Sequence, residues 1–406
     1  MKPECASGSD TPLVRPYMPE LDSLRGIAVL AVVFYHGMAP PLGVELATFW
    51  RSLFSLRQYG WTGVNLFFVL SGFLITGILL DNKQRRGYFR RFYFRRALRI
   101  LPAFYGMLLV LLIGGWVSFR FAAISILFLA NFAAVLGARL SYGPLWSLAV
   151  EEHFYMLWPL MVRRFSVRSL TILAVLVWIG SLFLRLLTLG SSAPQHFASL
   201  YTWFNLDGLL LGALLAIWLR APSFRRHQLA RVALPVTMGS TAAFFFLAGH
   251  PGGYATVVTS VCNLACAGFL SCTLLVGTSS WRSLVDRPIL KFFGFISYGL
   301  YLVHVLAFRI SDILLSNLLG ALVVNGKPVI ATLLRFSTGL VLGTGIAYLS
   351  RRSLEEKFLR IGYSSGSGRA AFSYATETAP AKAPTPVDPS RRVALPRDAF
   401  LKPTED

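Results

Sequence analysis

The chain has 406 residues, of which 55% are hydrophobic and only 14% charged, and its mean hydropathy is +0.60. Soluble domains typically carry about 25% charged residues, so this composition excludes an ordinary soluble protein. The remaining charges are mostly positive, and the formal net charge is +21. The arginines lie between apolar runs of about 20 residues, as in the cytoplasmic loops of membrane proteins. We therefore expect a lipid bilayer as partner and no nucleic acid.

Eleven apolar stretches follow one another along the chain. They lie at 24–42, 62–80, 98–117, 121–138, 147–162, 169–189, 201–219, 229–248, 254–276, 291–311 and 328–350. In lipid, each stretch must satisfy its own backbone polar groups, and an uninterrupted helix does this most simply. The pattern predicts an all-α fold, a polytopic bundle of transmembrane helices.

Basic loops decide the predicted orientation. The loop after the second stretch, KQRRGYFRRFYFRRALR, belongs in the cytoplasm by the positive-inside rule. If all eleven stretches crossed, the arginines at 163–168 and 220–231 would lie outside. If 119–143 dips in and returns, every basic loop falls inside. We predict about ten crossings, one re-entrant segment and cytoplasmic termini, with eleven crossings as the alternative.

The two ends of the chain differ in composition from the apolar region. Residues 1–19 contain no apolar core typical of a signal peptide, so we expect a short cytoplasmic segment there. The membrane domain is predicted at 20–352. Residues 353–406, with SSGSGRAAF and APAKAPTPVDPSRR, are too polar to form a core, so we expect a largely disordered cytoplasmic tail.

The first apolar stretch carries Arg25 near its start and His36 deeper in. Eleven residues return a helix almost to the same face, about 16 Å along the axis. Asp22, three residues before Arg25, can pair with it. Ionisable residues inside a membrane helix are candidates for function. The alternative is an Arg–Asp anchor with a histidine bonded to neighbouring backbone.

Two further motifs place charges in apolar helices. PLWSLAVEEHFYMLWPL carries Glu151 and Glu152, which cannot share a helix face. We expect one of them in the polar interior, where a carboxylate can orient a histidine, and the other at helix ends or loops. RRFYFRRALRILP carries Arg96 and Arg99, which suit a phosphorylated ligand. A structural network and ordinary positive-inside anchoring are the respective alternatives.

Later motifs add further polar groups. SYGLYLVHV carries Tyr298, Tyr301 and His304, and an interfacial aromatic belt would explain the tyrosines but not the deeper histidine. Arg185 and Asp207 are single charges at depth that could pair with each other. The cysteines in the stretch at 254–276 lack the ligand spacing of a metal site, so no metal is expected.

These motifs, in this order, resemble the acyltransferase-3 family of bacterial integral membrane O-acyltransferases. The similarity runs from Pro19 to Arg352 through PELDSLRGIAVLAVVFYH, GVNLFFVLSGFLITGILL, RRALRILPAFY, LWSLAVEEHFYMLWP and SYGLYLVH. The resemblance implies acyl transfer from cytoplasmic acyl-CoA, often acetyl-CoA, to hydroxyls of a carbohydrate, glycolipid or related metabolite. It implies a bacterial cytoplasmic (inner) membrane protein with acyl-CoA as co-substrate and no bound cofactor. No esterase-like sequence follows, so we expect the stand-alone form.

The resemblance also implies roles for individual residues. It makes His36 catalytic with Arg25, gives support from Glu151 and Glu152, assigns donor binding to Arg96 and Arg99, and makes Asp22, Asn65, Tyr298, Tyr301 and His304 possible substrate or support residues. Many relatives carry an acidic residue at Asn65 and an arginine at Asn205. If those two positions are partners, the two changes would compensate.

In the implied mechanism, coenzyme A phosphates dock at the arginine pair and the pantetheine arm reaches inward. His36 then acts either as general base on the acceptor hydroxyl or as transient acyl carrier. The sequence leaves both routes open. The alternative function is a transporter or flippase for an acyl or glycan intermediate, with no chemistry of its own.

Overall fold

The computed structural model describes residues 15, 18–40, 47–187, 200–249, 255–275 and 287–359. Within these ranges the regular structure is entirely helical and no strand occurs, which confirms the all-α prediction. Most of the N-terminal segment 1–19 lies outside the described residues, as does the tail beyond residue 359.

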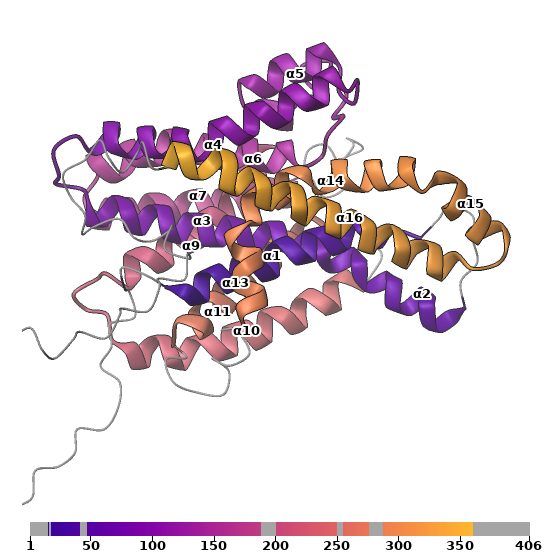
Figure 1. The fold of residues 1–406 in the computed structure, drawn as a ribbon. Coiled ribbons are helices and arrows are strands. Elements are labelled where there is room, and N and C mark those ends of the chain that lie inside the picture. The colour runs from indigo at the N-terminus through magenta and orange to yellow at the C-terminus, as the bar shows by residue number, and fades with distance from the viewer. Residues whose placement is uncertain are drawn as a thin grey trace, which may run out of the picture.

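Ten helices of 17 residues or more run roughly along one direction in the described part of the chain (Figure 1). They are α1 (Pro19–Gly37), α3 (Thr62–Asp81), α4 (Tyr88–Ile113), α6 (Leu145–Arg164), α7 (Val167–Leu187), α9 (Thr202–Trp218), α10 (Arg226–Ala248), α11 (Ala255–Leu275), α14 (Ser297–Leu314) and α16 (Pro328–Ser350). The shorter elements are α2 (Thr48–Ser55), α5 (Phe119–Ile126), α13 (Pro288–Phe295), α15 (Ser316–Val324), the 3₁₀ turns η1 (Leu56–Trp61) and η2 (Ala130–Phe132), and the π-helical turn η3 (Arg351–Glu355).

Six helices among the described residues are long and apolar enough to cross a membrane, or seven if one bent pair forms a single span. A helical membrane bundle is thereby confirmed, whereas the number of crossings stays a prediction. Helices α1 and α6 are outside this set because each carries several charged residues. Some of those charges, such as Arg25 and Glu151, are residues that the sequence analysis assigned to the site.

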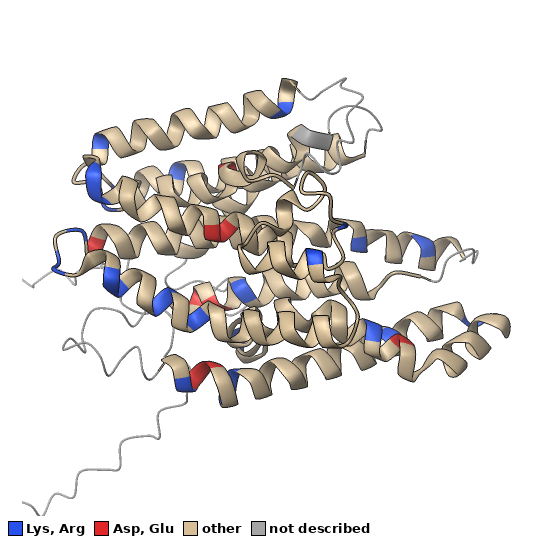
Figure 2. Cartoon of the chain, turned by 90° about the horizontal axis from the view of Figure 1, so that it is seen from above, with Lys and Arg blue, Asp and Glu red and all other residues tan. Residues whose placement is uncertain are grey.

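Lysine and arginine residues gather mainly at one end of the bundle (Figure 2). We call this the basic end; it comprises the loops at 82–87, 163–168 and 219–226. The α3–α4 and α6–α7 loops meet there, since Lys83 Nζ donates to the carbonyl of Phe165 at 2.5 Å and Arg163 donates to the carbonyl of Lys83. Helices α3, α4, α6 and α7 therefore each have one terminus at the basic end.

The segment 119–143 begins and ends at the opposite end of the bundle. Helix α4 runs away from the basic end to Ile113, and α6 returns to it from Leu145. Between them, α5 has only eight residues, about 12 Å of helix against a hydrocarbon core of about 30 Å. Phe128 takes a left-handed backbone conformation, with φ of 57°, and its ring stacks 4.7 Å from Phe104 of α4. Both ends of this segment thus lie at one end of the bundle, and its re-entrant placement in a membrane stays a prediction.

The sequence predicted one continuous helix for the apolar stretch at 291–311, and this prediction is wrong. Helices α13 and α14 meet at an angle of 78°, and α13 runs across the bundle against α1 (Figure 1). Two glycines cause this approach. A Cβ on Gly26 would lie 2.0 Å from the carbonyl oxygen of Leu290, and one on Gly294 would lie 1.9 Å from that of Asp22. Backbone packs directly on backbone, and the crossing fixes the start of α14.

Candidate active site

A cavity lies between α1, α3, α4, α6 and α14, and the empty space in and in front of it is about 690 Å³. Its wall brings together six residues predicted from the sequence: Arg25, Arg96, Arg99, Glu151, Tyr298 and Tyr301. Phe67, Phe68, Ile100 and Leu148 supply an apolar lining. A mixed wall of guanidiniums, a carboxylate and aromatic rings is typical of a pocket for an amphipathic, anionic small molecule.

Arg96 is enclosed by groups of its own protein. Its guanidinium lies 3.6 Å from the centre of the Tyr155 ring, and its nitrogens lie 4.0 Å from Glu151 and 3.9 Å from Glu152. These separations exceed hydrogen-bond length. Arg96 Nε and Glu152 Oε1 are both buried without a hydrogen-bond partner. The two carboxylates thus balance the positive charge of Arg96, but Nε of Arg96 still lacks a hydrogen-bond acceptor.

Arg99, one turn further along α4, has a different environment. In the described part of the chain no carboxylate lies within ion-pair distance of it, and its charged neighbours include Arg25, Arg96 and Arg351. Arg25 keeps only a long contact of 3.5 Å to Asp22, which confirms the expected pairing within α1. Clustered guanidiniums suit an anion such as a phosphate group.

The two adjacent glutamates do not divide as the sequence predicted. Glu151 lines the cavity and accepts hydrogen bonds from Ser71 at 2.9 Å and Tyr155 at 3.0 Å. Glu152 does not bond to helix ends or loops, because it also faces Arg96. Neither carboxylate bonds to His36, whose hydrogen bonds within the described chain are to other groups. The two glutamates hold an arginine rather than orient a histidine.

His36 is instead paired with His304 of α14. His304 Nε2 lies 3.2 Å from His36 Nδ1, while His36 Nδ1 also lies 3.0 Å from the carbonyl of Val32. His304 Nδ1 lies 2.7 Å from the carbonyl of Tyr301. Carbonyl oxygens only accept hydrogen bonds, so each Nδ1 carries a proton. His304 Nε2 then accepts from His36 Nδ1–H, and His36 Nε2 keeps its lone pair.

Neither histidine lines the cavity described above. Tyr301 connects the two regions, because it is part of the cavity wall, its hydroxyl bonds to Ser147, and its ring centre lies 5.7 Å from that of His304. His304 is only 1% exposed, whereas His36 is half-buried. Tyr301 is therefore adjacent both to the basic pocket and to the histidine pair. Tyr298, on the pocket side, donates to the carbonyl of Ile100 at 2.9 Å.

Two ion pairs near the site were missed by sequence reasoning. Arg335 of α16 donates to the carbonyl of Gly37 at 2.9 Å, at the end of α1, and pairs with Asp312 at 2.5 and 3.1 Å. It thereby satisfies a terminal carbonyl of the helix that carries His36. Arg351 and Glu355 pair at 3.0 Å within η3, which packs against α4. The sequence signal for Arg335 is a charge within an apolar run, and for the second pair an i,i+4 spacing.

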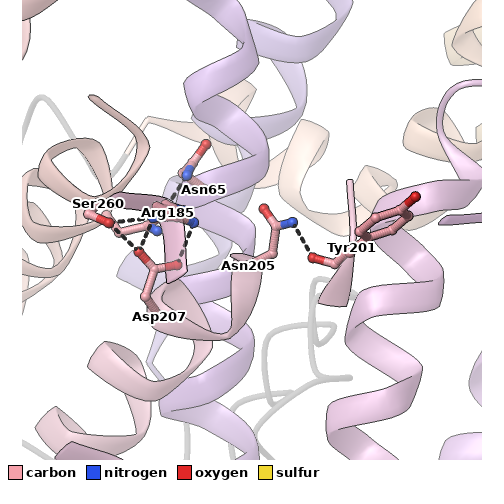
Figure 3. Close-up of polar contacts among 7 residues, drawn as sticks. Asn65, Arg185, Tyr201, Asn205, Asp207 and Ser260 are labelled. Carbon is pink, nitrogen blue, oxygen red and sulfur yellow. Dashed lines mark hydrogen bonds and ion pairs between the residues drawn. The ribbon is translucent and has the colours of Figure 1, made fainter. Parts of the chain in front are cut away.

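A buried ion pair links α7 to α9 (Figure 3). Arg185 donates to both carboxylate oxygens of Asp207, at 2.6 and 3.0 Å, and Ser260 of α11 donates to the same carboxylate at 3.0 Å. Asp207 is fully buried and Arg185 nearly so. The pairing suggested by the sequence is confirmed, and its closed geometry indicates a structural role.

Asn65 and Asn205 do not pair with each other (Figure 3). Asn65 donates to the side chain of Asn263 at 2.7 Å, and Asn205 donates to the carbonyl of Tyr201 at 3.0 Å. The suggested compensation between the two positions is therefore wrong. Asn65 lies on α3 but outside the cavity wall, where it joins α3 to α11.

The sequence of the whole apolar region matches a known family. A family model described as an acyltransferase domain matches residues 18–352. This chain belongs to that acyltransferase family. The resemblance inferred from the five motifs is confirmed, and the matched residues contain every element around the cavity.

Individual relatives of this acyltransferase are bacterial. A putative peptidoglycan O-acetyltransferase of Bacillus subtilis is 31% identical over 333 residues, which cover 71% of this chain and 48% of the relative. The peptidoglycan O-acetyltransferase of Listeria monocytogenes is 35% identical over 170 residues, 37% of this chain and 25% of the relative. Putative O-acetyltransferases of Staphylococcus aureus are 28% identical over 330 residues, 71% of this chain and 50% of each relative. The chain spans about half or less of the length of these relatives. No solved structure matches it.

Proposed function

We propose that this protein is a membrane O-acyltransferase that moves an acyl group, typically acetyl, from acyl-CoA to a carbohydrate hydroxyl. Its place is the bacterial cytoplasmic membrane, with the basic end and both termini in the cytoplasm. The acceptor is a cell-envelope polysaccharide or a glycolipid. The relatives named as peptidoglycan O-acetyltransferases support this acceptor class.

The observation that carries the proposal is the hydrogen-bond chain through the two histidines. His304 Nε2 accepts the hydrogen bond from Nδ1–H of His36. The Nε2 lone pair of His36 is therefore available to a reacting group. His36 is half-buried and can be reached, whereas His304 is enclosed behind it. A base held by a third group in this way is the usual arrangement for activating a nucleophile.

The cavity supports acyl-CoA as the donor. Arg99 and Arg25 provide guanidiniums for the coenzyme A phosphates, and the apolar wall at Phe67 and Leu148 suits the pantetheine arm. Tyr301 lines this cavity and lies next to His304 of the histidine pair. The thioester must reach His36 past that ring.

In the general-base route, His36 Nε2 removes the proton of the acceptor hydroxyl while its oxygen attacks the thioester carbonyl. The C–O ester bond forms, the C–S bond breaks, and the leaving thiolate takes the proton from the imidazolium. In the acyl-carrier route, the Nε2 lone pair attacks the thioester carbonyl, the C–S bond breaks, and a thiolate leaves the acylated imidazolium. The acceptor hydroxyl then attacks the acyl carbonyl, the C–N bond breaks, and the hydroxyl proton passes to the thiolate, which restores the neutral imidazole. Both routes need the same tautomer of His36.

Purified protein in bilayers, supplied with acetyl-CoA and a cell-envelope glycan, tests the proposal. We expect release of free coenzyme A together with acetyl ester on the glycan. General acid–base catalysis typically contributes about 10²–10⁴-fold, so His36→Ala should lose at least that much turnover. His36→Gln keeps volume and hydrogen bonding but no titratable nitrogen, and it should be as inactive as His36→Ala.

His227→Gln is the matched control, because His227 is exposed at the basic end, away from the site. Its turnover should equal that of the unchanged protein. Near-normal ester formation by His36→Gln would remove His36 from the chemistry. Movement of glycan or acyl intermediate across the bilayer, with no ester formed by the unchanged protein, would favour the transporter or flippase instead.

A further inference from the structure

A second cavity lies on the side of the bundle remote from the active site. It is an open groove with walls from α7 and α10 and a floor from α9 and α11, and the empty space in and in front of it is about 1050 Å³. Residues lining it include Thr171, Trp218, Val232, Val236, Gly268 and Ser271. Along α10 the lined stretch runs from Leu229 to Val236, which is about 10 Å of helix. None of the residues assigned above to acyl transfer lines this groove.

The two hydroxyl groups in the wall of this groove already donate their protons to the protein backbone. Thr171 donates its hydroxyl proton to the carbonyl of Val167 at 2.9 Å, and Ser271 donates to that of Ala267 at 2.8 Å. Both bonds lie within their own helix. A sugar or a nucleotide would lose its water here without replacement, which is costly. Hydrocarbon is the chemistry that fits.

The groove opens toward the basic end. Val167, which lines it, is the first residue of α7, and Arg168 follows directly. On the other wall, Arg225 immediately precedes α10. Both arginines are exposed. In the described residues neither has a carboxylate within ion-pair distance, since the guanidinium of Arg225 donates only to the carbonyls of Pro222 and Phe224.

We propose that this groove binds an anionic phospholipid, with one acyl chain between α7 and α10 and the phosphate group at Arg168 and Arg225. The two halves of the site require an amphiphile: an apolar slot and a cationic rim. Trp218, at the end of α9, lies where the slot meets the rim, as tryptophans do at the level of lipid headgroups. Basic pockets between membrane helices are known to select anionic headgroups.

The test compares two lipids that share their acyl chains and differ only in charge, phosphatidylglycerol and phosphatidylcholine. Each is added to delipidated protein in detergent, and retention is measured by native mass spectrometry at low and high salt. We expect phosphatidylglycerol to be retained about tenfold better at low salt, with the preference falling as salt screens the headgroup. Equal retention of the two lipids at low salt would overturn the proposal.

Two variants probe the two halves of the site, each with a control on α10. Val236→Trp fills the slot and should abolish retention of phosphatidylglycerol, whereas Leu234→Trp, about 160° away around the helix, should not. Arg168→Gln should lower the phosphatidylglycerol preference about tenfold through the lost charge-assisted bond. Arg231→Gln, facing away from the groove on α10, should keep it.

Arg168 is exposed, so its variant remains informative even where Val236→Trp fails to fold. An unchanged preference in Arg168→Gln would show that the arginine rim does not bind the phosphate group. Unchanged retention in a folded Val236→Trp would show that the lipid acyl chain does not lie in the slot between α7 and α10. Because acyl transfer is not measured, these outcomes are independent of the proposed enzyme function.

Discussion

Arg96 and Arg99 lie one helical turn apart and carry the same charge, yet the structure gives them unequal roles. Arg96 faces two glutamates and the Tyr155 ring, whereas Arg99 faces mainly other guanidiniums. An incoming phosphate therefore gains more from Arg99, which has no carboxylate within ion-pair distance among the described residues. From the sequence we assigned donor binding to both arginines alike. Only their neighbours in the folded protein distinguish them.

We predict that Arg99→Ala raises KM for acyl-CoA about tenfold or more, because a charge-assisted bond typically contributes about 1.5–3 kcal/mol. Its kcat and folded yield should stay close to those of the unchanged protein. Steady-state kinetics with varied acyl-CoA measures the separation. An unchanged KM with normal yield would show that Arg99 does not bind the donor and only anchors the helix end on the cytoplasmic side.

Arg96→Ala should instead destabilise the fold, because it leaves the half-buried Glu151 and Glu152 without a nearby cation. Breaking a buried pair by removing one partner typically costs about 3–5 kcal/mol. Thermal unfolding in detergent should show the loss, and adding Glu152→Gln should recover part of it. If Arg96→Ala unfolds at the same temperature as the unchanged protein, the proposed balance of charges is wrong.

His304 is a positioning residue in this account, since it touches His36 and not the reacting groups. His304→Leu removes the acceptor for His36 Nδ1–H and should lower kcat about tenfold, the equivalent of one neutral hydrogen bond. His304→Gln can still accept through its side-chain oxygen and should recover much of that loss. A merely structural role would give equal kcat for both variants at equal folded yield.

At the scale of helices, hydropathy located nearly every membrane element but not the break at Ile296. Residues 291–311 are largely apolar, so hydropathy does not mark the 78° turn between α13 and α14. Its cause is the contact of Gly26 with a segment more than 260 residues later. Such backbone packing depends on two distant glycines meeting, which one sequence alone cannot reveal.

Gly26→Ala tests that contact. Its Cβ would lie 2.0 Å from the Leu290 carbonyl oxygen, so α13 must move away from α1, at a typical overpacking cost of about 1–3 kcal/mol. Gly180→Ala in α7 is the control, because nothing lies within 4 Å of its added Cβ. Thermal unfolding should shift down for Gly26→Ala and stay level or rise for Gly180→Ala. Equal behaviour of the two would contradict the packing of α13 on α1.

For the candidate site, too, local sequence motifs reveal single residues but not the contacts between residues that are far apart in the chain. Motifs identified Arg25, His36 and Glu151 because charged groups in apolar helices are conspicuous in sequence. The partner of His36 was not identifiable, since His304 lies 268 residues away, and adjacent glutamates were the nearer guess. The sequence therefore indicated which polar residues gather at the cavity and the histidine pair, but it did not predict the contact between His36 and His304.

For the whole molecule, the segment at 119–143 fixes the orientation of everything that follows it. If it stays at the end opposite the basic end, the arginine-rich loops at 163–168 and 219–226 lie on one side of the membrane. The structure returns the chain from this segment into α6 with Arg163 at the loop of Lys83. The positive-inside rule then places Arg139 outside and Gln84 in the cytoplasm.

Single cysteines at these two positions test the orientation, in a background without the four native cysteines. Arg139 and Gln84 are both exposed, so a maleimide can reach either one from its own side. A membrane-impermeant maleimide should label Arg139→Cys in intact cells and Gln84→Cys only after permeabilisation. Labelling of both positions only after permeabilisation would place 119–143 across the membrane. That result would move the arginines at 163–168 outside, and the assignment of the basic end to the cytoplasm would fall with it.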